Sequence, residues 1–107
     1  AMFDSASVND DKTCEVIADV KQETGKLLDP HTAVGVESAR MVRSSRDAPM
    51  VTLATAHPAK FADAITAAGL DLPGLPPHLA DLFERDERYA VVDNDLAQVT
   101  SYIKAHI

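Results

Sequence analysis

The sequence predicts an α/β fold that is rich in helices, with the element order α-α-β-α-α-β-α. Residues 50–54 form a short, mostly apolar run with β-branched members, which is typical of a strand buried on both faces. Residues 89–92 form a second short run of this kind. The segments around both runs carry helical spacing of apolar residues and helix-capping residues.

Capping residues mark the first two helices. Asn9 can cap a helix whose apolar residues repeat at helical spacing, and Gly25 can end it in a left-handed conformation. Asp29 can cap a second helix that begins at Pro30. Gly35 lies inside this helix, where glycine costs about 1 kcal/mol relative to alanine. Its presence there indicates close packing against backbone or against a cofactor.

The first predicted strand leads directly into a third helix. Pro58 fits the first position of this helix, which continues to about Ala68 and stops at Gly69. The turn at residues 55–57 therefore follows the carboxyl end of a strand. Open α/β sheets place their ligands at such ends.

The remaining elements are shorter. The proline-rich residues 72–77 predict a rigid linker, and a short helix is expected around residues 79–83. The second strand, at residues 89–92, precedes a final helix that Asp93, Asn94 or Asp95 can cap. Two strands joined by a helical crossover are expected to be parallel, but a sheet of two strands is narrow for an independent domain. We therefore expect the chain to be part of a larger sheet.

Length and composition exclude several classes of function. The 107 residues predict one domain over residues 3–107, with Ala1 and Met2 interpreted as a cloning remnant. The net charge of −7 argues against nucleic acid and against anionic membranes as partners. No apolar run has the length of a membrane-spanning helix. The single cysteine, Cys14, cannot form an internal disulfide, so a reducing, cytoplasmic setting is expected.

Three kinds of catalytic or binding site lack their sequence signals. A metal site is not expected, because the histidines are scattered and none forms a pair four residues apart; they are His31, His57, His78 and His106. The Gly-x-Ser-x-Gly motif of many hydrolases is absent, and so is a glycine-rich phosphate loop.

The turn after the first strand carries three candidate site residues. Thr55 offers a hydroxyl, with a strand-end residue bonded to nearby backbone as the alternative. His57 can act as an acid or base, although a structural helix cap is the more economical interpretation. Lys60 is expected to be exposed in the first helical turn, which argues against a nucleophile and leaves a distant contact to an anion.

A second group of candidates, Asp29, His31 and Thr32, surrounds the start of the second helix. Capping by Asp29, and a hydrogen bond between Thr32 and a free N–H or carbonyl of the first turn, would explain two of them without a ligand. Their alternative role is to line an active site.

Two segments carry a family resemblance. Residues 53–61, Leu-Ala-Thr-Ala-His-Pro-Ala-Lys-Phe, resemble the "LATAHPAKF" segment of threonine synthases. Residues 28–35, Leu-Asp-Pro-His-Thr-Ala-Val-Gly, resemble the "LDPHTAVG" segment of the same family, and residues 92–95 give a looser match. The resemblance extends from about Phe3 onward and implies the C-terminal portion of a much longer enzyme. The larger sheet would then be that of a fold-type II pyridoxal-phosphate enzyme.

The resemblance also implies a function. Threonine synthases are lyases of threonine biosynthesis that convert O-phospho-L-homoserine and water to L-threonine and phosphate with pyridoxal phosphate. Thr55 matches the residue that lies against the ring nitrogen of the cofactor. The lysine that carries the cofactor is expected upstream, so this chain holds no catalytic residue and is expected to be inactive alone.

The expected partners are the remainder of a threonine synthase chain and, for the isolated chain, other copies of itself. The alternative function is a free-standing, non-catalytic interaction module that kept the fold.

Overall fold

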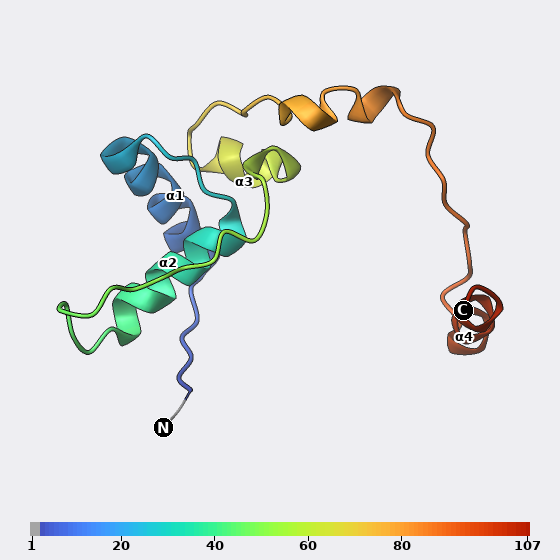
Figure 1. Cartoon of the computed structure of the whole chain (residues 1–107), viewed down its shortest axis with the longest axis horizontal. Coiled ribbons are helices and arrows are strands. Elements are labelled where there is room, and N and C mark those ends of the chain that lie inside the picture. Colours follow the sequence, from blue (N-terminus) through green and yellow to red (C-terminus); the bar gives the residue numbers. More distant parts are fainter. Residues whose placement is uncertain (1–2) are drawn as a thin grey trace. The chain divides into compact units, whose positions relative to one another are not determined.

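The computed structural model describes residues 3–107, which form two compact units. The first unit ends at Pro76, and the second extends from Pro77 to Ile107. The first contains α1 (Asp10–Thr24), α2 (Pro30–Val42), the 3-10 turn η1 (Pro58–Lys60) and α3 (Ala62–Ala67), all labelled or coloured along the chain in Figure 1. The second contains the 3-10 turns η2 (Pro77–Leu79) and η3 (Leu82–Glu84), followed by α4 (Leu96–Ala105).

The predicted caps of α1 and α2 are confirmed. The Asn9 side chain accepts the N–H of Lys12 at 2.9 Å. Gly25 ends α1 with φ of 73°, a conformation that costs glycine little because it has no Cβ. Asp29 caps α2, and Pro30 is its first residue.

The core of the first unit lies where α1, α2 and α3 pack together (Figure 1). Each fully buried aliphatic side chain contributes about 1.5–3 kcal/mol to the free energy of unfolding. The leucines that connect α1 to α2, together with Val36, Ala68 and Leu70, surround this cluster. Its buried members are Val16, Ile17, Val20, Ala33 and Ile65.

The predicted strands are wrong, because no residue between 3 and 107 adopts strand structure. Residues 50–54 instead run along α2 without regular structure (Figure 1). Thr52 packs against this helix, whereas Val51 and Leu53 are 79% and 76% exposed. A strand needs a neighbour that completes its backbone hydrogen bonds, and no described segment supplies one. Apolar, β-branched composition favours a strand only in such surroundings.

The second predicted strand fails for the same reason. Tyr89 and Val91 are largely exposed, and nothing within residues 3–107 pairs with residues 89–92. The predicted helix from Pro58 to Ala68 forms only in part. Phe61 has φ of −128° and ψ of 57°, and this residue separates η1 from α3. The short helix expected around residues 79–83 is reduced to the two turns η2 and η3.

The second unit has local structure without a core. Asp95, one of the three residues predicted as caps, caps α4 by accepting the N–H of Gln98 at 2.9 Å. None of residues 77–107 is buried. In the part of the chain that the structure describes, no helix combines the length and the apolar character needed to cross a membrane.

Candidate functional site

The turn at residues 55–57 lies against the first turn of α2. The backbone N–H of Thr55 donates to Oγ1 of Thr32 at 3.2 Å, across 23 positions of sequence. The two segments singled out by sequence, residues 28–35 and 53–61, are therefore in direct contact.

Asp29 organises the start of α2 from a buried position. Its side chain is 1% exposed, and Oδ1 accepts the backbone N–H groups of His31 at 3.0 Å and Thr32 at 3.3 Å. Its second oxygen, Oδ2, accepts the hydroxyl of Thr32. Both carboxylate oxygens thus have donors, as a buried charge requires.

The surroundings of Asp29 keep it ionised. Burial acts most strongly on the pKa of Asp29 and raises it. The hydrogen bonds from the Thr32 hydroxyl, from the N–H groups of Thr32 and His31, and from the His31 ring together outweigh burial. The pKa of Asp29 therefore lies below its ordinary value, and the site holds a fixed negative charge at neutral pH.

Three side chains form the exposed edge of this site. Nδ1 of His31 lies 3.2 Å from Oδ1 of Asp29, and its ring packs on Phe61 with centroids 4.9 Å apart. Nζ of Lys60 lies 5.9 Å from the centroid of the Phe61 ring, within the range of a cation–π contact. Both His31 and Lys60 are exposed, as predicted for Lys60.

The structure confirms the predicted helix-cap role of His57. Its Nδ1 accepts the N–H of Ala59 at 3.2 Å, at the start of η1. The ring nitrogen that makes this bond is an acceptor and carries no proton.

The side chain of Thr55 is exposed, and its hydroxyl has no hydrogen-bond partner among residues 3–107. The hydrogen bond from its backbone N–H to Thr32 holds the main chain at this position, and the exposed hydroxyl remains available to an external acceptor.

Sequence analysis missed the link between Thr32 and Thr55. The sequence predicts a bond from Thr32 to a free N–H or carbonyl of the first turn, whereas its hydroxyl donates to the carboxylate of Asp29, the capping residue that precedes α2. The acceptance from Thr55 joins positions far apart in the chain, and no local pattern marks such a contact. Gly35 gave the one indirect signal, since a Cβ at this position would lie 3.0 Å from Cγ2 of Thr52.

A metal ion has no evident ligands here. Among residues 3–107, no three His, Cys, Asp or Glu side chains are placed to bind one together. Cys14 is a free thiol, partly buried between α1 and α3.

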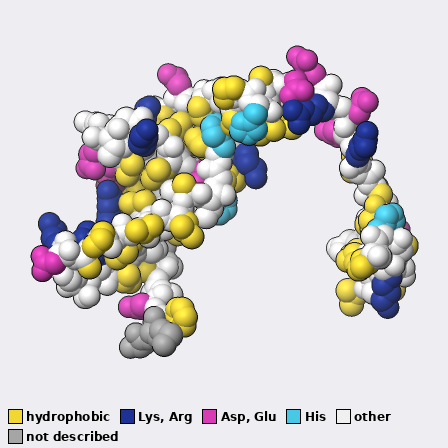
Figure 2. Space-filling model, viewed as in Figure 1, with side chains coloured by type: hydrophobic (Ala, Val, Ile, Leu, Met, Phe, Trp, Pro, Cys, Tyr) yellow, Lys and Arg dark blue, Asp and Glu magenta, His cyan; other side chains and the backbone are white. Residues whose placement is uncertain are grey.

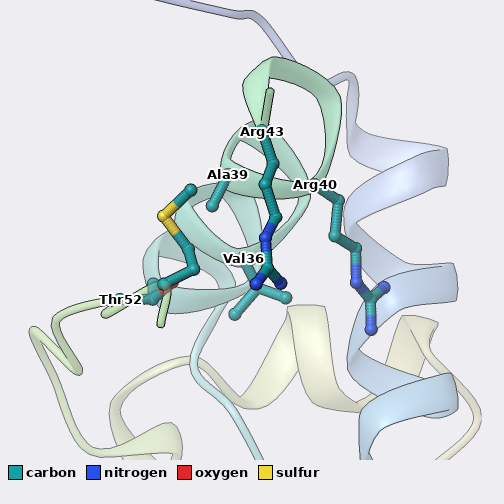
Figure 3. A pocket seen from close by; sticks show the side chains of 6 residues that line it. Val36, Ala39, Arg40, Arg43 and Thr52 are labelled. Carbon is teal, nitrogen blue, oxygen red and sulfur yellow. The ribbon is translucent and has the colours of Figure 1, made fainter. Parts of the chain in front are cut away.

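A cavity of about 190 Å³ lies beside the site, between α2 and residues 50–52 (Figure 3). Arg40 reaches toward α1 and pairs with Glu23 at 3.9 Å and Glu37 at 3.5 Å. The guanidinium of Arg43 donates to three backbone carbonyls between residues 45 and 48. Both positive charges therefore already have partners within the chain. The cavity is lined by Val36, Ala39, Arg40, Arg43, Met50 and Thr52.

Comparison with known proteins gives consistent matches. The family model "Threonine synthase, C-terminal" matches residues 32–103. Threonine synthase of Pseudomonas aeruginosa is 55% identical over 106 residues, which cover 98% of this chain and 23% of that protein. Threonine synthase of Corynebacterium glutamicum is 39% identical over 87 residues, which cover 81% of this chain and 18% of that protein.

A solved structure is similar as well. The crystal structure of pyridoxal-phosphate-bound threonine synthase from Brucella melitensis superposes with a TM-score of 0.74 at 48% identity. The match covers 91% of this chain and 21% of that one. The chain thus spans about a fifth of the length of the relatives that it matches.

Proposed function

The chain belongs to the threonine synthase family, and from this we propose that it is the C-terminal part of a threonine synthase. The whole enzyme would be a pyridoxal-phosphate-dependent lyase that converts O-phospho-L-homoserine and water to L-threonine and phosphate. The observation that carries the proposal is the family match over residues 32–103, which includes the turn where Thr55 presents its hydroxyl.

Thr55 is assigned to the cofactor. When bound, pyridoxal phosphate supplies an electron sink for the negative charge that develops on the substrate carbon. A hydroxyl cannot stabilise a protonated pyridine as a carboxylate does, so Thr55 would donate a hydrogen bond to a neutral ring nitrogen. Through this bond Thr55 would leave the ring a milder electron sink than a protonated pyridine. The availability of the Thr55 hydroxyl supports this role.

The other candidates divide by burial. His31, His57 and Lys60 are exposed around the turn and are proposed to line the active site. Asp29 and Thr32 are buried behind it, where they would support the lining from within. The lysine that carries the cofactor would belong to the part of the enzyme upstream of this chain, because Lys60 is exposed at the edge of the site rather than enclosed in it.

The remainder of the enzyme is the proposed partner of an exposed apolar surface, formed by Met41, Met50, Val51 and Leu53. Figure 2 shows a row of hydrophobic side chains over the segment that runs along α2. Relatives of about four to five times the length would have chain to cover it. The isolated chain is then expected to self-associate through this surface. A cytoplasmic setting, where Cys14 stays reduced, completes the proposal.

A segment exchange tests the proposed function. This chain replaces the matching 106 residues of the Pseudomonas aeruginosa threonine synthase, and phosphate release from O-phospho-L-homoserine is measured. The chimera is expected to turn over at an ordinary enzymatic rate, about 1 per second or more. The isolated chain with pyridoxal phosphate is expected to give none. A chimera that folds as the parent does but releases no phosphate would contradict the proposal, and so would turnover by the isolated chain.

A further inference from the structure

We propose that Thr32 is a positioning residue for Thr55, and that the buried carboxylate of Asp29 holds the Thr32 hydroxyl in the orientation this role needs. The inference rests on the proposed function only where Thr55 is said to serve the cofactor. The hydrogen bonds that carry it belong to the chain itself.

The direction of each hydrogen bond follows from the chemistry of the groups. An ionised carboxylate can only accept, so the single proton of the Thr32 hydroxyl goes to Oδ2 of Asp29. The lone pairs of that hydroxyl then remain to accept, and the backbone N–H of Thr55 uses one of them. Asp29 thereby determines that the Thr32 hydroxyl donates toward Asp29 and accepts from Thr55.

Burial makes the arrangement difficult to replace. Asp29 is 1% exposed and Thr32 is 4% exposed, so water has little access to either group. If the Thr32 hydroxyl were removed, one oxygen of Asp29 would lose a donor and the N–H of Thr55 would lose its acceptor. The loss is expensive at Asp29, whose oxygen would be left buried without a donor.

The contact also fixes the segment that precedes Thr55. Thr55 bonds to Thr32 in the first turn of α2. Thr52, three residues before Thr55, packs on Gly35, which lies three residues after Thr32. The segment therefore runs along the helix in the opposite direction and touches it at two points. The Thr32–Thr55 bond is the polar one of the two, so it determines where the turn ends and where the Thr55 hydroxyl emerges.

Because Asp29 also caps α2, one carboxylate serves both the start of the helix and the turn. A change at Asp29 would be felt at Thr55, 26 positions later in the sequence. Through Thr32, Asp29 becomes part of the support of the proposed cofactor contact.

Amide exchange measured by NMR in the 107-residue chain tests the inference. In the parent chain, the Thr55 amide is expected to be protected from exchange, although it lies in an irregular segment. Thr32→Val keeps the shape and removes the hydroxyl, and it should speed exchange at Thr55 about tenfold. Thr32→Ser keeps the hydroxyl and should restore most of the protection.

Thr13→Val is the matched control, because Thr13 is also buried and its hydroxyl donates locally, to the backbone carbonyl of Asn9 at the start of α1. Any effect of this change on Thr55 should match its effect on amides throughout the first unit. An unprotected Thr55 amide in the parent would overturn the inference, and so would equal responses to Thr32→Val and Thr13→Val. Failure of the proposed function would appear separately: the chimera would be inactive, while the exchange rates measured in the 107-residue chain would still follow the expected pattern.

Discussion

Both units contain a helix capped by an aspartate, but only the first unit packs its helices around a buried core. In the first, aspartate-capped α2 packs with α1 and α3 around five buried aliphatic residues. In the second, aspartate-capped α4 buries none of its residues. Capping thus determines where a helix begins, whereas tertiary packing requires apolar residues from other elements. The first unit is expected to hold the site because it alone has a core to position it.

Asp29 and Asp95 show this contrast at a single residue type. Each caps a helix with its carboxylate. Asp29 is buried and also bonds the hydroxyl of Thr32, whereas Asp95 is exposed. The same sequence signal therefore has a larger energetic role where the surroundings are buried.

Truncation of a core residue should give the largest difference between the units. Ile17 is fully buried in α1, and Ile17→Ala is expected to cost about 2–5 kcal/mol in the free energy of unfolding. Ile103 is half exposed in α4, and Ile103→Ala should cost well under 1 kcal/mol. Urea unfolding followed by circular dichroism measures both. Equal losses would contradict the assignment of the core to the first unit.

Removal of the caps should give the next largest difference. Asp29→Ala is expected to cost about 2 kcal/mol or more, because it removes a helix cap and a charged partner of buried donors. Asp95→Ala removes an exposed cap and should cost about 1 kcal/mol or less, confined to α4. Amide exchange in the two helices measures the losses separately. A larger loss at α4 than at α2 would contradict the contrast.

The charge of Asp29 should also make the first unit sensitive to acid. The folded pKa of Asp29 lies below its unfolded value of about 3.9, so its contribution to stability is complete above that value. This contribution is lost as the pH falls through the folded pKa. Asp29→Asn should flatten the dependence of stability on pH in this range. His31→Gln serves as the control for the ring that contacts the carboxylate, and an unchanged acid profile in Asp29→Asn would contradict the assignment.

Charge placed on the exposed apolar surfaces should have the smallest effect on stability. Leu53→Lys is expected to reduce self-association of the chain with less than about 0.5 kcal/mol change in stability, since Leu53 is largely exposed. Leu96, 83% exposed in α4, provides the matched substitution in the second unit. Light scattering over a dilution series compares Leu53→Lys with Leu96→Lys. If Leu96→Lys reduced self-association more than Leu53→Lys, the association surface would lie in the second unit, contrary to the proposal.

Local chemistry allowed the helices to be predicted better than the strands. Asn9, Gly25, Asp29 and Asp95 act through neighbours within four residues, and each ends or begins a helix as predicted. Strands depend on a partner segment, which the composition of residues 50–54 could not supply. The described chain offers none, so both predicted strands are irregular.

The sequence predicted which residues lie at the candidate site, but it did not predict the hydrogen bond that joins its two segments. The cap made by His57 and the exposure of Lys60 follow from their places around Pro58, and both are confirmed. The bond between Thr32 and Thr55 depends on how the chain returns along α2, which no local pattern encodes. The role of Thr55 toward a cofactor stays a prediction from the family resemblance.

Cofactor retention tests the central claim, that the turn after residue 54 presents the Thr55 hydroxyl to pyridoxal phosphate. In the chimera with the Pseudomonas aeruginosa enzyme, Thr55→Val is compared with Thr66→Val, a change on the exposed side of α3. Equilibrium titration of the apoenzyme with the cofactor gives the dissociation constants. Thr55→Val is expected to weaken binding about tenfold, for the loss of one buried hydrogen bond, and Thr66→Val should leave it unchanged. Equal affinity of Thr55→Val and the parent chimera would contradict the account.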